Sequence, residues 1–250
     1  MSGAGGSAVD WVEVFSPYSL PHLGAVVAFV GLTAIACVLG RRWRGTERGT
    51  ALRWFIAGTA LMMQLLMVAY YLTPAAFNPQ ESWPLHLCDL GAFLAPAALV
   101  ARSRWMMTLV VFWGIGLSSQ AFVQPTLVEG YGSLAFWFYW LQHGFVVGIG
   151  IFAVATGYRP GWRDWFFVGA VNLGLVLAIT PVNIWLDSNY MFIGENNSVA
   201  VIDAFGPWPL RIVTIYLACQ IVMGVMVLLF RAGERMLSKP AAARSAGASV

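Results

Sequence analysis

The sequence predicts an all-α membrane protein, a bundle of seven transmembrane helices with its N-terminus outside and its C-terminus in the cytoplasm. Three observations lead to this fold class. Hydrophobic residues make up 59% of the chain and charged residues only 10%, whereas a soluble domain carries about 25% charged residues. Apolar runs of bilayer length recur from one end of the chain to the other. Arginines gather in alternate connecting segments, as the positive-inside rule requires.

The seven spans follow from apolar runs that end at turn-rich or arginine-rich segments. The first run ends at "RRWRGTERGT" and the second at "TPAAFNPQESWP". Two arginines separate the third run from the fourth, and both of these runs are short. The fourth ends at "QPTLVEGYG", the fifth at "GYRPGWRD" and the sixth at the long segment "DSNYMFIGENNSVAVIDAFGPWP". The predicted spans are 23–40, 54–72, 85–101, 105–121, 134–156, 165–186 and 209–230.

These spans divide the chain into three parts. Residues 1–22 form an outer N-terminal segment, and residues 23–232 form the seven-helix transmembrane domain. Residues 233–250 form a cytoplasmic tail, for which the alanine-rich end "PAAARSAGASV" predicts disorder.

The charged residues set the orientation. Thirteen of the fourteen basic residues fall on one side of the seven-span model, and Arg211 is the exception. The thirteen are Arg41, Arg42, Arg44, Arg48, Arg53, Arg102, Arg104, Arg159, Arg163, Arg231, Arg235, Lys239 and Arg244. Acidic residues gather on the other side: Asp10, Glu13, Glu81, Glu129, Asp187, Glu195 and Asp203. The net charge of +3 therefore reflects topology and does not indicate a nucleic-acid partner.

Seven spans with an outer N-terminus also suggest a rhodopsin, but the sequence argues against one. A retinal Schiff base needs a lysine inside a span, and the only lysine in the chain, Lys239, lies in the predicted tail. No cofactor is indicated. The chain has three cysteines, an odd number spread over three spans, so no disulfide framework is expected.

The stretch "WPLHLCDLG" (83–91) places three polar residues at the predicted start of the third span. Polar groups within the bilayer are costly and mark functional sites. His86 and Asp89 are three residues apart, so they share a helical face, while Cys88 points elsewhere. A deep histidine, His143, is the candidate partner for Cys88. Counting 1.5 Å per residue, Cys88 lies about 6 Å and His143 about 13 Å below the outer interface.

The motifs "WPLHLCDL", "WLQHG", "NYMF" and "GPWP", taken together, resemble the YwaF type of bacterial integral membrane proteins. That family is similar to the eukaryotic transmembrane protein 164 group of phospholipid acyltransferases. The resemblance runs from about the second span to the seventh. It implies a multi-pass protein of the bacterial inner membrane, with membrane lipids as partners and a lipid or acyl substrate.

The resemblance also implies a site. Cys88 and His143 map onto the proposed catalytic cysteine and histidine of the eukaryotic group, with His143 drawing the proton from the Cys88 thiol. The residues expected to support this pair or to bind substrate are His86, Asp89, Gln120, Asn183, Asn189 and Tyr190.

Two other classes of function stay open. A zinc-dependent membrane hydrolase would use His86, Asp89 and His143 as ligands, but sites of that kind commonly need a third histidine, which only His22 is left to provide. A non-enzymatic transporter, receptor or assembly factor would use the same polar residues as a hydrogen-bonded network between helices. The oligomeric state is left open by the sequence.

Overall fold

A computed structural model describes residues 8–197 and 199–246 of the chain, and helices dominate them. Regular α-helices account for most of the described chain. They are α1 (Ala8–Glu13), α2 (Leu20–Arg42), α3 (Glu47–Tyr71), α4 (Leu87–Ala101), α5 (Arg104–Val111), α6 (Leu134–Ala155), α7 (Trp162–Leu186), α8 (Ala200–Asp203) and α9 (Leu210–Ala246). A π-helical turn, η1 (Phe112–Leu117), and a 3₁₀ turn, η2 (Ser118–Phe122), continue α5, and a short 3₁₀ turn, η3 (Tyr190–Phe192), follows α7.

Six membrane-length helices are present among the described residues. They are α2, α3, the composite helix Arg104–Phe122, α6, α7 and the Leu210–Met236 part of α9. The remaining predicted span, the third (85–101), forms only the 15-residue helix α4. At 1.5 Å per residue α4 is about 22 Å long, which is less than the roughly 30 Å of a hydrocarbon core. The multi-pass helical class is confirmed, while the count of seven crossings and the orientation of the termini stay predictions.

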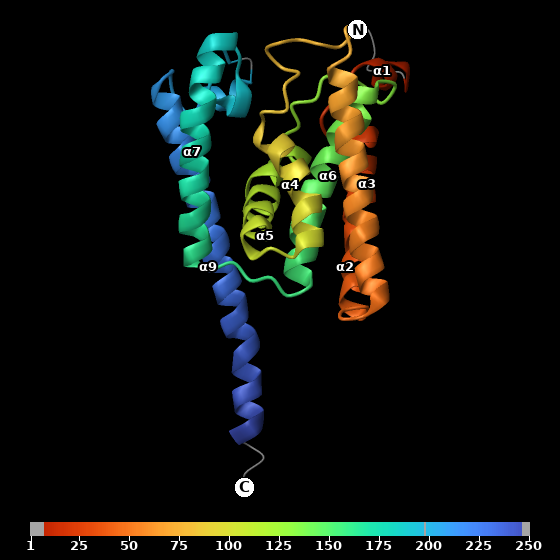
Figure 1. The fold of residues 1–250 in the computed structure, drawn as a ribbon, viewed down its shortest axis with the longest axis vertical. Helices are drawn as coiled ribbons and strands as arrows, with labels where there is room; N and C mark the ends of the chain where they lie inside the picture. Colours follow the sequence, from red (N-terminus) through yellow and green to blue (C-terminus); the bar gives the residue numbers. More distant parts are fainter. Residues whose placement is uncertain (1–7, 198, 247–250) are drawn as a thin grey trace, which may run out of the picture.

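The short α4 has a visible cause in the segment before it. Figure 1 shows residues 72–86 leaving the top of α3 and descending between the helices before α4 begins. We call this end of the bundle the outer end, following the predicted orientation. The descending segment turns at Asn78, whose carbonyl accepts hydrogen bonds from the backbone N–H groups of Glu81 and Ser82. Most residues of this segment are exposed, and Pro84, Leu85 and His86 are partly buried where it reaches the start of α4.

Helix α6 lies at the centre of the bundle and packs against α2, α3, α4, α5 and η1. The closest approach is to η1 at Gly114. A Cβ atom at Gly114 would lie 2.6 Å from the carbonyl oxygen of Val146, so only glycine allows the two backbones to meet there. Helices α4 and α6 both run from the outer end inwards, side by side (Figure 1).

Helices α7 and α9 form a second unit that packs on the bundle through α5 and η1. The Trp165 indole donates to the Gln220 carbonyl at 2.9 Å, which joins α7 to α9. The Trp113 indole donates to Asn172 at 2.9 Å, which joins η1 to α7. Helix α9 continues to Ala246 and extends well beyond the other helices (Figure 1). It therefore passes through most of the segment 233–250 that the sequence assigns to a tail, and residues 247–250 lie outside the described chain.

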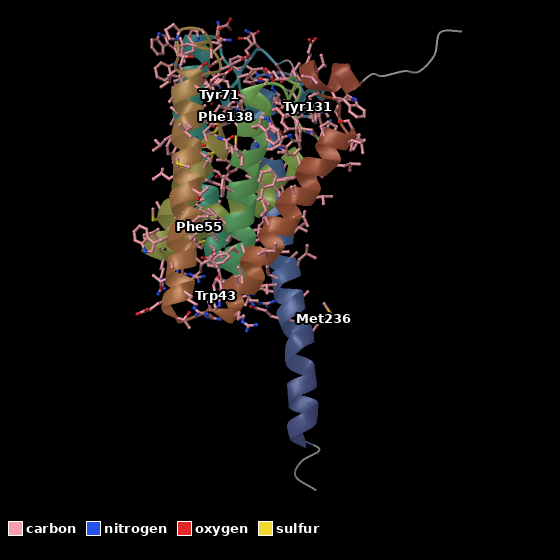
Figure 2. The ribbon with its side chains drawn as sticks, turned by 90° about the vertical axis from the view of Figure 1, so that its right-hand side faces the viewer. Trp43, Phe55, Tyr71, Tyr131, Phe138 and Met236 are labelled. Atoms are coloured by element: carbon pink, nitrogen blue, oxygen red, sulfur yellow. The ribbon has the colours of Figure 1, made fainter. Side chains whose placement is uncertain are left out.

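The outward faces of the helices are apolar, as a lipid environment requires. Phe55 on α3 is 71% exposed and Trp185 on α7 is 82% exposed. Figure 2 shows Tyr71 and Tyr131 near the outer end and Trp43 near the opposite end, close to the loop between α2 and α3. Aromatic residues at both ends of the bundle match the aromatic belts of membrane proteins.

Candidate functional site

The two proposed catalytic residues come from adjacent helices. Cys88 is the second residue of α4 and is half-buried. His143 lies near the middle of α6 and is 8% exposed. The residue after Cys88, Asp89, and the residue before His143, Gln142, join the two helices. The Gln142 side-chain amide donates to the Asp89 carboxylate at 2.6 Å.

The bond between Asp89 and Gln142 changes the relative depths that the sequence predicts for Cys88 and His143. The sequence places Cys88 about one helical turn nearer the outer surface than His143. In the structure α4 begins below the outer end, because residues 72–86 descend before it (Figure 1). Since Asp89 and Gln142 are hydrogen-bonded, the residues beside them, Cys88 and His143, lie at similar levels. The periodicity of an isolated span contains no information about such a descent.

Among the described residues, no hydrogen bond joins the Cys88 thiol to His143. The Tyr139 and His143 rings are 4.4 Å apart between centroids. His86 and Cys88, at the start of α4, thus lie on the helix that packs against the α6 helix of Tyr139 and His143, and we call these four side chains the site neighbourhood.

The tautomer of His143 follows from its backbone partner. Nδ1 of His143 lies 2.8 Å from the carbonyl oxygen of Tyr139, one helical turn earlier. A carbonyl oxygen can only accept, so this bond requires the proton on Nδ1 and leaves Nε2 as the basic nitrogen. The histidine is thereby oriented by the backbone of its own helix.

His86 and Asp89 do pair, but through the backbone of His86. Asp89 accepts a hydrogen bond from the His86 N–H at 2.9 Å, which caps the start of α4. The His86 ring instead accepts from the backbone N–H of Met191 at 3.3 Å and lies against the rings of Tyr190 and Phe192. His86 therefore connects the start of α4 to the segment after α7.

The segment after α7 is held by Asn183. Its side-chain oxygen accepts from the Tyr190 N–H at 2.8 Å and from the Ser188 hydroxyl at 2.9 Å, and its amide donates to the Tyr190 carbonyl at 2.9 Å. The Tyr190 hydroxyl accepts from the Trp83 N–H at 3.2 Å. Burial raises the pKa of Tyr190, so the hydroxyl keeps its proton at neutral pH and donates to the Pro79 carbonyl.

Two further residues tie this segment together. Asn189 accepts from the Gly194 N–H at 2.9 Å and donates to Asn197 at 3.1 Å. Arg211, 4% exposed at the start of α9, donates to the backbone carbonyls of Gly194 and Glu195. The polar side chains of this segment are thus engaged with its own backbone.

Gln120 is the one predicted residue that lies apart from these contacts. It belongs to η2, its side chain is exposed, and none of its described hydrogen bonds reaches His86, Cys88, Asp89 or His143.

The histidines and acidic residues do not form a metal-ligand set in the described chain. His22 does not reach His86 and His143 to complete a zinc site. Its Nδ1 accepts from the Tyr18 N–H at 2.8 Å, its Nε2 lies 3.1 Å from the Phe122 carbonyl, and its ring stacks on Trp140. The donor arrangement therefore does not fit the zinc-hydrolase alternative.

The sequence assigned no role to Tyr139 of the site neighbourhood, or to Gln64 and Gln142 beside it. The two glutamines are visible in the sequence as polar residues inside apolar spans, which is a signal for function. Nothing in the sequence links them to Asp89, because Gln64 lies on α3 and Gln142 on α6, whereas Asp89 lies on α4. Tyr139 lies within the aromatic run "FWFYW", which is typical of an interfacial belt and conceals its contact with His143.

A family model matches most of the chain. The model of the TMEM164 family matches residues 15–227, which include α2 to α7, the segment after α7 and α9 as far as Val227. The chain belongs to the TMEM164 family. The resemblance found in the four sequence motifs is thereby confirmed at the level of this family, and the YwaF type is compatible with it. No curated protein and no solved structure matched the chain.

Proposed function

We propose that this TMEM164-family protein is a lipid acyltransferase, or an acyl hydrolase, that uses Cys88 as nucleophile and His143 as base. The observation that carries the proposal is the bond between Asp89 and Gln142, 2.6 Å long. It joins α4 and α6 one residue away from both reactive side chains. Acyl transfer through a thioester needs a thiol and an imidazole close together, and α4 and α6 supply one of each beside this bond.

The first half-reaction transfers an acyl group to the protein. Nε2 of His143 takes the proton of the Cys88 thiol, and the thiolate attacks the carbonyl carbon of a lipid ester. The tetrahedral intermediate then loses the lipid alcohol, which takes the proton back from His143, and a thioester remains on Cys88. Catalytic hydrogen bonds are often longer without substrate and shorten in the complex, so the thiol and imidazole need not be bonded beforehand.

The start of α4 supplies the groups that stabilise negative charge. The N–H groups of Asp89 and Leu90 donate to the His86 carbonyl, which leaves those of Leu87 and Cys88 ahead of the first hydrogen bonds of the helix. Such first-turn N–H groups are natural donors to an oxyanion, and the helix dipole acts in the same direction. We assign the oxyanion contact to this turn instead of to Gln120 or Asn183, whose side chains are exposed or fully engaged.

The second half-reaction decides between transferase and hydrolase. A lipid hydroxyl or a water molecule attacks the thioester, His143 takes its proton, and the Cys88 thiolate leaves and is reprotonated. An acyl ester lies near the headgroup boundary of a leaflet, and the proposal requires such an ester to reach Cys88 from the outer side. Cys88 is half-buried, so part of its side chain is accessible to that ester.

The proposal is tested by trapping the thioester. The purified protein is incubated with vesicles of a phospholipid that carries an alkyne-tagged acyl chain, and the tag is located by mass spectrometry. We expect a hydroxylamine-sensitive acyl group on Cys88, less of it in His143→Ala, and none in Cys88→Ala. Acylation spread equally over Cys37, Cys88 and Cys219 would overturn the thioester mechanism and favour a non-enzymatic role for the polar network.

A further inference from the structure

The polar contacts between α3, α4 and α6 extend beyond the proposed catalytic pair. The Gln142 amide nitrogen donates to two acceptors, the Asp89 carboxylate at 2.6 Å and the side-chain oxygen of Gln64 at 3.2 Å. All three side chains are buried: Gln64 is 2% exposed, Asp89 7% and Gln142 8%. One amide group thus joins three helices through buried side chains.

The Gln64 amide nitrogen has no hydrogen-bond partner among the described residues. Gln64 and Gln142 line a cavity of about 10 Å³ between α3, α4 and α6, whose other walls are apolar. A buried amide donor without a partner is costly, and a leucine at either position would avoid that cost. Because α3, α4 and α6 already pack through apolar side chains, the glutamines are not needed merely to fill the space.

We propose that Gln142 is a positioning residue for the reaction and that Gln64 supports it. Gln142 fixes the level of α4 against α6 through Asp89, and so sets the separation between the Cys88 thiol and the His143 imidazole. This inference rests on the proposed function, because it assigns a role within the same reaction. Helices in lipid have no hydrophobic force that fixes their relative level, so a specific polar bond is well suited to that task.

The bond has a direction, which makes the inference testable. Asp89 uses one oxygen to accept from the His86 N–H and the other to accept from Gln142. In Asp89→Asn combined with Gln142→Glu, the new asparagine still accepts from His86 and donates to the new glutamate. Gln64, with its amide turned over, donates to that glutamate as well. The double variant therefore keeps the bond from His86 and restores the other two bonds with donor and acceptor exchanged. Gln142→Glu alone places two carboxylates in contact, whereas Asp89→Asn alone is accommodated when the Gln142 and Gln64 amides both turn over.

The experiment measures the rate at which iodoacetamide alkylates Cys88 at pH 7 in the purified full-length protein, with Cys37 and Cys219 as internal references. Gln142→Leu and Gln142→Glu should slow alkylation of Cys88 about tenfold, as His143→Ala does, because an unassisted thiol is only a few per cent thiolate at this pH. The Asp89→Asn, Gln142→Glu double variant should recover most of the rate. Gln220→Leu is the matched control, because it removes a buried glutamine amide from α9, away from the site.

The outcomes separate the two proposals. If His143→Ala slows alkylation of Cys88 and Gln142→Leu does not, the positioning role is wrong and the proposed reaction stands. If His143→Ala has no effect on Cys88, the catalytic pair itself is wrong. If Gln142→Leu slows the reaction and the double variant does not recover, the bond to Asp89 is not the cause and the inference fails. Thermal unfolding of each variant shows whether a slow rate reflects a misfolded bundle, and the recovery by the double variant decides the matter even if Gln142→Leu is unstable.

Discussion

The carbonyl oxygen of Tyr139 accepts a hydrogen bond from Nδ1 of His143, one turn further along α6, at 2.8 Å. An acidic residue plays this orienting part in many catalytic triads, whereas here the backbone supplies it. The orientation should therefore survive removal of the Tyr139 hydroxyl. We predict that Tyr139→Phe keeps most of the acyl-transfer activity and that the rate of Cys88 alkylation changes less than about threefold. A loss as large as that of His143→Ala would show that the hydroxyl itself takes part.

The catalytic pair predicts a specific pattern of losses. Cys88→Ala and His143→Ala should each lower acyl turnover by about 10³-fold or more, and the double variant should be no worse than either, because the two residues act as one unit. Cys88→Ser should also be poor, since a hydroxyl is much harder to ionise than a thiol. Mass spectrometry of membrane lipids from cells expressing each variant measures the effect.

Cys219→Ala is the control for these losses. Cys219 packs among the apolar side chains of η1, α7 and α9, remote from His143, and its removal should leave the lipid profile unchanged. If Cys88→Ala proves no worse than Cys219→Ala, the polar residues at the start of α4 serve packing alone.

The segment after α7 predicts a stability effect without direct catalysis. Asn183 is 3% exposed, and its side chain makes three hydrogen bonds that hold Ser188 and Tyr190. Asn183→Ala leaves these buried groups without partners and should lower the free energy of unfolding by about 2 kcal/mol. The same change should increase proteolysis between Asn189 and Asn197. Unchanged thermal unfolding and proteolysis would show that another residue holds the segment.

The sequence alone predicts more of the helix bundle than of the candidate site. The ends of α2, α3, α6 and α7 fall within a few residues of the predicted ends, because apolar runs of bilayer length between arginine-rich and turn-rich segments constrain them strongly. The exception is the start of α3, which lies seven residues earlier than predicted. The short α4 also agrees with the predicted span 85–101 to within two residues, but the descent of the segment before it could not be predicted. Whether residues 72–86 lie outside the bundle or descend into it depends on contacts with Tyr190, which is more than a hundred residues away.

The site shows the same limit. Asn183 is a polar residue in a span, and from sequence alone it is as good an oxyanion donor as any other. Only the structure shows that its amide is already used by Tyr190. Gln142 is equally visible as a polar residue, yet its function depends on Asp89 and Gln64, which lie on other helices. Composition identifies costly polar groups, and tertiary contacts decide which of them are structural.

The inner end of the bundle carries a buried carboxylate that predicts a large effect on folding. Asp164, 2% exposed at the start of α7, accepts from the Gly161 N–H at 2.8 Å, from Arg104 at 2.7 Å and from Thr108 at 3.2 Å. Asp164→Ala should lower the free energy of unfolding by about 3 kcal/mol, since it removes a helix cap and leaves buried donors without an acceptor. The Arg104 side chain is 58% exposed, so Arg104→Ala should cost about 1 kcal/mol or less. Chemical unfolding in detergent compares the two.

The last prediction concerns topology. With the N-terminus outside, Glu129 and Glu195 lie at the outer end, and Arg44, Arg104 and Arg163 lie at the cytoplasmic end. A reporter that is active only outside the cytoplasm should work when fused after Glu129 or Glu195 and fail after the three arginines. The fusion after Arg104 is the informative one, because α4 has only 15 residues and Arg104 follows it directly. If that fusion were active outside, α4 and the composite helix that follows would form a re-entrant hairpin, and Cys88 would lie in a different leaflet position from the one that the acyl-transfer mechanism requires.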